Sequence, residues 1–127
     1  MLDMSIGGDR YLRQGSMARA SQGELLQGTL PLLILRTLAT GSNHGFAIAR
    51  RIQQISKSVL RVEQGSLYPA LHRMELDGLI ESYWGTTENN RKAKYYRLTR
   101  RGKRQLATET QRWTAIAGAV ATILQEG

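Results

Sequence analysis

The sequence contains no cysteine and no long apolar run. The lack of cysteine excludes a disulfide framework, thiolate zinc ligands and a thiol nucleophile, and it suits a protein of the reducing cytoplasm. The longest apolar run, from Leu32 to Leu35, stops at Arg36, far short of the about 20 residues that cross a membrane. No basic segment followed by an apolar one opens the chain, so we expect no signal peptide and no membrane partner.

Signatures of enzymes are missing as well. The two histidines, His44 and His72, stand without other ligands at metal-binding spacing. The sequence has no serine-hydrolase motif, no phosphate-binding glycine loop and no dinucleotide fingerprint. We therefore expect no enzyme activity, no metal and no cofactor.

Positive charge is what the chain has in excess. The net charge is +8 and the pI is near 10.4, which favours a polyanionic partner. Eight basic residues and a single acidic residue, Glu88, lie between Thr86 and Arg104. A solvated charged surface is the alternative interpretation, but the concentration of charge in one segment favours a nucleic-acid contact.

Hydrophobic periodicity predicts the first two helices. Residues 24–40 are rich in Leu and Ile on all sides, and such a helix must be covered on more than one side. Residues 44–56 have apolar side chains at helical spacing, among them Phe46, Ile48, Ile52 and Ile55. Residues 1–22 carry too little apolar material to fold alone, and we expect them to form a flexible N-terminal arm.

A third helix and a hairpin follow. Ser66 suits the N-cap of the helix, which places Pro69 in its first turn, and Gly78 suits a left-handed end. Residues 79–84 and 94–99 predict two strands. Tyr96 and Leu98 lie on one face of the second strand and Tyr95 and Arg97 on the other. Trp84 is expected to pack inside the domain.

These elements predict a mainly α fold with a small β-hairpin, a winged helix-turn-helix over residues 23–99 whose third helix lies in the major groove. Side chains that suit bases or phosphates near the start of that helix are Gln64, Ser66, Tyr68, His72 and Arg73. The hairpin, or wing, suits backbone contacts beside the minor groove through Asn90, Arg91, Lys92 and Lys94. Packing inside the domain is an equally good interpretation of Tyr68.

Residues 100–127 predict a long C-terminal dimerisation helix. A heptad-like seam runs along it through Leu106, Trp113, Ile116, Val120 and Ile123. The first helix offers Leu26, Leu30 and Leu33 to the same interface. A surface helix that packs only on its own domain is the alternative.

Several spaced motifs carry a resemblance to a known family. They are His44-Gly45-Phe46, Gln64-Gly65-Ser66-Leu67-Tyr68-Pro69, and Lys94-Tyr95-Tyr96-Arg97-Leu98-Thr99 with Gly102. In this order, and over about residues 24–124, the chain resembles the PadR family of bacterial transcriptional regulators. Ser66 and Phe46 replace the Thr and Tyr that are common there, and Pro31 departs from the pattern in the first helix, where it bears on the dimer contact.

The resemblance implies a winged-helix domain and a C-terminal helix that packs against the partner subunit, including its first helix. It also implies action as a repressor at a palindromic operator. The single C-terminal helix is similar to the compact branch of the family, some members of which bind flat aromatic drugs between paired tryptophans at the dimer interface. Trp113 stands at the matching place, although a plain packing role at the interface is the preferred interpretation.

We therefore expect a cytoplasmic, homodimeric repressor that binds double-stranded DNA at an inverted repeat. Its half-sites should lie about one helical turn apart or a multiple of it. The alternatives are a regulator that responds to a small-molecule effector near Trp113, a non-specific architectural DNA-binding protein, and a purely structural dimerisation module.

Overall fold

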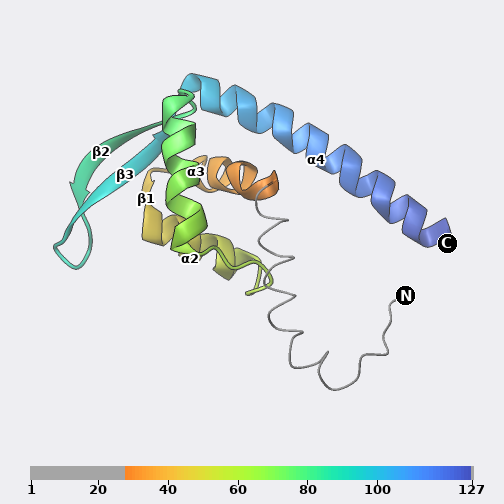
Figure 1. The fold of residues 1–127 in the computed structure, drawn as a ribbon, viewed down its shortest axis with the longest axis horizontal. Coiled ribbons are helices and arrows are strands. Elements are labelled where there is room, and N and C mark those ends of the chain that lie inside the picture. The colour runs from red at the N-terminus through yellow and green to blue at the C-terminus, as the bar shows by residue number, and fades with distance from the viewer. Residues whose placement is uncertain (1–27, 127) are drawn as a thin grey trace, which may run out of the picture.

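The computed structural model describes residues 28–126. Helical conformation covers residues 28–38, and the elements that follow are β1 (Asn43–His44), α2 (Gly45–Ile55), α3 (Gln64–Leu76), β2 (Ile80–Thr86), β3 (Lys92–Leu98) and α4 (Arg100–Glu126). The hairpin of β2 and β3 extends from one side of the three shorter helices and α4 from the other (Figure 1). This is the winged helix-turn-helix with a long last helix that the sequence predicts. The expected N-terminal arm and Leu26 lie outside the described residues.

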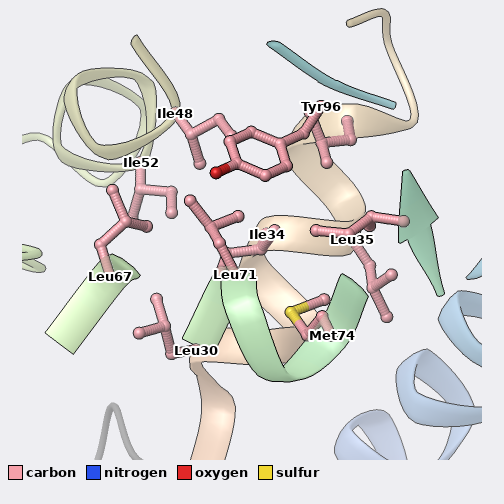
Figure 2. Packing of buried hydrophobic residues seen from close by; sticks show 11 residues of the cluster. Leu30, Ile34, Leu35, Ile48, Ile52, Leu67, Leu71, Met74 and Tyr96 are labelled. Atoms are coloured by element: carbon pink, nitrogen blue, oxygen red, sulfur yellow. The ribbon is translucent and has the colours of Figure 1, made fainter. Parts of the chain in front are cut away.

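A single cluster of buried side chains joins the helices to the sheet (Figure 2). Its members are Leu30, Ile34, Leu35, Leu38, Ile48, Ile52, Leu67, Leu71, Met74, Ile80 and Tyr96. Full burial of one such aliphatic side chain stabilises the fold by about 1.5–3 kcal/mol. Leu30, which we predicted at a subunit interface, is only 3% exposed. It shares the inward face with Ile34 and Leu38, one and two turns further on, and presents almost no surface to a partner.

The sheet has three antiparallel strands in the order β1-β3-β2, one more than the predicted hairpin. β1 pairs Asn43 with Tyr96 and His44 with Tyr95, so the residues just before α2 extend the sheet. Two residues are too few for a pattern of alternating hydrophobicity, which is why the sequence did not predict this strand. Tyr96 is buried and Arg97 exposed, as the alternation of β3 predicts.

The predicted bounds of α3 are wrong at its beginning. The helix starts at Gln64 with Glu63 as its N-cap, and no side chain caps it. Ser66 therefore lies in the first turn instead of preceding it, and Pro69 lies in the second turn, where its missing N–H removes one helical hydrogen bond. The predicted end is confirmed, because Gly78 has a φ of +76° and so adopts the left-handed conformation.

Two apolar residues of α2 are not inside. Phe46 is 52% exposed and Ile55 64%. Phe46 lies on the opposite side of the helix from the buried Ile48 and Ile52. Ile55 is the last residue of α2 and is left uncovered.

Thr99 and Gly102 attach α4 to the end of α3. The Thr99 hydroxyl donates a hydrogen bond to the Gly78 carbonyl at 2.7 Å and accepts one from the Gly102 amide at 3.0 Å. A Cβ atom at Gly102 would collide with the carbonyl oxygen of Leu79. Every residue from 110 to 126, well past this join, is exposed. Within residues 28–126, no helix has the length and apolar character needed to cross a membrane.

Candidate nucleic-acid interface

α3 is anchored by one face and open to solvent on the other. Leu67, Leu71 and Met74 are buried against the core. The five residues predicted to contact DNA from this helix are all exposed: Gln64, Ser66, Tyr68, His72 and Arg73. Gln64, Tyr68 and His72 follow one another at intervals of four residues, while Ser66 and Arg73 lie on the other flank of the outward face. The arrangement leaves a polar and basic helix surface free to enter a groove.

Tyr68 has a packing role as well as an exposed surface. Its ring lies against Gly45 at the start of α2, where an added Cβ would come within 2.7 Å of the ring atom Cε1. The side chain is still 43% exposed. Tyr68 therefore sets the contact between α2 and α3 and also reaches the solvent-facing side of the helix pair.

A groove of about 770 Å³ lies between α2 and the wing. Its basic lining residues are Arg50, Arg51, Arg91, Lys92 and Lys94, and Glu88 is its acidic one. Helical periodicity turns Arg50 and Arg51 away from the buried Ile48 and Ile52, but it says nothing about what lies opposite them. The sheet places them across from the wing, and the five cations form a site suited to a polyanion.

Three exposed aromatic residues also line this groove, and Tyr68 is one of them. Trp84, which we predicted to be packed, is 66% exposed. Phe46 lies in the same groove with the Arg50 guanidinium carbon 5.7 Å from the centre of its ring. The prediction for Trp84 failed because β2 extends past the helices there, so that the inner face of the strand is no longer covered (Figure 1).

The tip of the wing is a tight turn over residues 87–91. The Thr87 amide donates a hydrogen bond to the Arg91 carbonyl at 2.8 Å, and Asn90 has a φ of +63°. Asn tolerates this left-handed conformation better than most residues, which gives Asn90 a structural role beside any contact with DNA. Lys92 and Lys94 lie in β3 rather than in the tip, and their alternation puts both on one face of the strand.

The other basic residues of this segment lie elsewhere. Arg97 is on the opposite face of the hairpin, where its Nε donates to Glu81 at 2.8 Å and its guanidinium stacks over Tyr83. Arg100, Arg101, Lys103 and Arg104 belong to the first turns of α4 and are exposed. The basic residues that are close together in sequence are therefore divided among three surfaces. Only Arg91, Lys92 and Lys94 lie in the groove opposite α2.

His44 is a structural residue of this region. Its Nδ1 accepts a hydrogen bond from the Ala47 amide at 3.3 Å and so caps α2. Its ring meets Tyr95 edge to face at a centroid distance of 5.3 Å. His44 thus joins the start of α2 to the wing.

A second, apolar hollow of about 420 Å³ lies between helix 28–38 and α4. Its apolar lining residues are Leu32, Leu33, Leu60 and Trp113. Trp113 is 44% exposed, and the later seam residues Ile116, Val120 and Ile123 are 50%, 49% and 68% exposed. Leu106 instead packs against the chain's own core.

Comparisons with known proteins agree with this architecture. The family described as "Transcriptional regulator PadR-like family" matches residues 34–108. The transcriptional regulator Rv3488 of Mycobacterium tuberculosis is 37% identical over 89 residues, which cover 70% of this chain and 78% of that protein.

Solved structures show the same similarity. A PadR family transcriptional regulator from Eggerthella lenta is 27% identical with a TM-score of 0.73, over 91% of this chain and 99% of that one. A PadR-like transcriptional regulator from Bacillus cereus is 29% identical with a TM-score of 0.70, over 80% of this chain and 97% of that one. The chain therefore belongs to the PadR-like family of transcriptional regulators.

Proposed function

We propose that the chain is a homodimeric repressor that binds an inverted repeat in double-stranded DNA, in the cytoplasm where that DNA lies. The observation that carries this proposal is the basic groove beside the open face of α3. In this arrangement α3 enters the major groove, and α2 and the wing hold the phosphate backbone next to it. Each phosphate that a cation neutralises makes the logarithm of affinity fall by about 0.9 per logarithmic unit of salt.

The proposed dimer rests on the second half of α4. Residues 110–126 are exposed, with large apolar side chains at Trp113, Ile116, Val120 and Ile123. A helix gains most of its stability from packing of its apolar face, and none of the described elements covers this one beyond Trp113. A second copy related by a two-fold axis would cover the same seam in both chains. Two α3 helices would then face successive turns of one side of the duplex.

Selection from a library of random duplexes tests the DNA-binding claim. The purified full chain should enrich an inverted repeat whose half-sites lie about 10 base pairs apart or a multiple of it. Enrichment of no sequence, with equal affinity for all duplexes, would instead indicate the non-specific architectural protein. An absence of salt-dependent binding would leave only the dimerisation module.

Repression has its own test. The enriched site is placed over a promoter in a purified transcription reaction, and the transcript is measured as the protein is added. We expect the transcript to decrease, whereas the same template with a scrambled site should be unaffected. An increase in transcript would show that the protein is an activator. That result would contradict repression but would leave the DNA-binding claim intact.

A second candidate function is response to a small molecule, and the apolar hollow beside Trp113 favours it. The chain has two tryptophans, so a Trp84→Phe variant leaves Trp113 as the sole tryptophan, which can be excited selectively over the tyrosines. Planar aromatic compounds that enter the hollow should change its fluorescence in a saturable way. Unchanged emission across a panel would remove this candidate and leave Trp113 as an interface residue.

A further inference from the structure

Glu75 joins α3 to both strands of the wing. Its Oε2 accepts a hydrogen bond from the Ser82 hydroxyl of β2 at 2.6 Å, and its Oε1 lies 3.7 Å from Lys94 Nζ of β3. Ser82 is the cross-strand partner of Tyr96, and Lys94 is two residues from Tyr96 on the same face. Among the described residues, these are the side-chain hydrogen bonds and ion pairs between α3 and the hairpin. The two oxygens of one carboxylate thus hold two different strands.

The contact lies where the hairpin leaves the core. Tyr96 is buried, while Trp84, the cross-strand partner of Lys94, is largely exposed. Burial raises the pKa of Tyr96, and the negative charge of Glu75 raises it further. The carboxylate is therefore close to the last buried residue of the wing, and the rest of the hairpin extends away from α3 (Figure 1).

An acidic residue at this place opposes the attraction of the groove for phosphate. Lys94 lines the groove, and Glu75 partly neutralises it, whereas Arg91 and Lys92 make no ion pair among the described residues. The Lys94 and Glu75 side chains are 44% and 32% exposed, so this long pair contributes little to stability. The hydrogen bond to Ser82 is much the shorter of the two contacts, and the charge on its acceptor strengthens it. Glu75 does not favour phosphate binding and is not part of the buried core, so neither role explains why an acidic residue stands at this position.

We propose that Glu75 is a positioning residue that fixes the direction of the wing relative to α3. The inference rests on the DNA-binding function proposed above. A duplex must meet α3 and the wing together, and their relative direction decides which sites allow both contacts. Glu75 then lowers affinity for DNA in general and increases discrimination in favour of the operator.

The chain offers a matched control in Glu81. Glu81 pairs with Arg97 at 2.8 Å on the opposite face of the same hairpin, and it touches no residue of α3 through that pair. E75Q and E81Q each remove one negative charge from the same region. They therefore change the net charge of the chain by the same amount, and only E75Q affects the link to α3.

A distance measurement without DNA tests the positioning role directly. Because the natural chain has no cysteine, two introduced ones at His72 on α3 and Asn89 at the wing tip are unique sites for spin labels. The labelled full chain is diluted with excess unlabelled chain, so that each distance reports one protomer. We expect a narrow distance distribution in the parent and in E81Q, and a broader one in E75Q. S82A should also broaden the distance distribution. If circular dichroism shows that E75Q does not fold, S82A is used for the test in its place.

Binding of unlabelled variants to DNA tests the consequence. The affinity for the duplex enriched by the parent is divided by that for a shuffled duplex of equal length. E75Q should lower this ratio by about tenfold, because the variant offers the Ser82 hydroxyl a neutral acceptor in place of a charged one and loses the ion pair with Lys94. E81Q should leave the ratio unchanged. A distance distribution or a ratio that matches E81Q overturns the proposal. A parent that shows no preference for any duplex refutes the sequence-specific DNA binding proposed above, and the distance measurement still decides whether Glu75 orients the wing.

Discussion

Gly45 and Tyr68 show how one pair of residues sets the helix-turn-helix. The aromatic ring occupies the space where any larger residue at position 45 would place its Cβ. This contact lies at the beginning of α2, close to the capping group of His44 and to the groove. The close packing of α2 against α3 therefore depends on glycine, which has no side chain, at position 45.

Gly45→Ala should destabilise the protein by about 1–3 kcal/mol, because the new methyl group overpacks this contact. Urea unfolding measures the change in free energy. Gly65→Ala is the matched control, since Gly65 lies in the first turn of α3 with no atom within 4 Å of an added Cβ. That variant should be neutral or more stable by up to about 1 kcal/mol. Equal stability of the two variants would show that Tyr68 moves aside without cost.

Arg73 and Lys92 should differ in how their loss affects DNA binding. Lys92→Ala is expected to weaken binding to enriched and shuffled duplexes by a similar factor and to reduce the salt slope by about 1, because its cation faces the backbone. Arg73→Ala should cost about 1–3 kcal/mol on the enriched duplex and relax its specificity. Titrations at several salt concentrations distinguish the two. Altered specificity in Lys92→Ala would contradict its assignment to the backbone.

At the scale of elements, α4 combines a fixed beginning with an uncovered second half. Thr99 and Gly102 hold its first turn on the loop after α3, while residues 110–126 present their side chains to solvent. The first turn of α4 is therefore attached directly behind the helix that is proposed to read DNA. The same element supplies Trp113 to the apolar hollow.

Val120→Glu together with Ile123→Glu should separate the proposed dimer, because burial of charge opposes association along the seam. Both residues are exposed within the chain, so the fold of the single chain should be preserved. Sedimentation is expected to show monomers, and binding to the inverted repeat should weaken strongly. Gln111→Glu and Gln125→Glu, which add the same charge at polar exposed positions of α4, serve as the control. Dimers that persist in the double variant would refute the seam.

At the scale of the whole molecule, patterns with several repeats were predictable from sequence. The alternation around Tyr96 indicated the inward face of β3, which is confirmed. The buried Leu67, Leu71 and Met74 of α3 are spaced by four and three residues, which is helical periodicity. The failures concern local or long-range geometry. Glu63 caps α3 without a side-chain bond, so no capping residue marked its beginning.

The basic groove could not be predicted for a different reason. Arg50 and Arg51 carry no signal that distinguishes a functional cation from a solvated one, and Trp84 looks like a core residue in an alternating strand. Only the packing of α2 against the sheet puts these residues opposite Lys92 and Lys94. Conversely, the spacing of Leu30 with apolar neighbours was consistent with an interface until its burial in the chain's own core was known.

The most direct test of the central claim is a titration of the full chain with two duplexes at one physiological salt concentration. One duplex carries the enriched inverted repeat, and the other carries the same bases with one half-site scrambled. Fluorescence anisotropy should show that the duplex with one scrambled half-site has lost most of the preference for the intact repeat, a preference that specific binding sets at about 10³-fold or more over non-specific DNA. Equal affinity for both duplexes would contradict a symmetric, sequence-specific regulator.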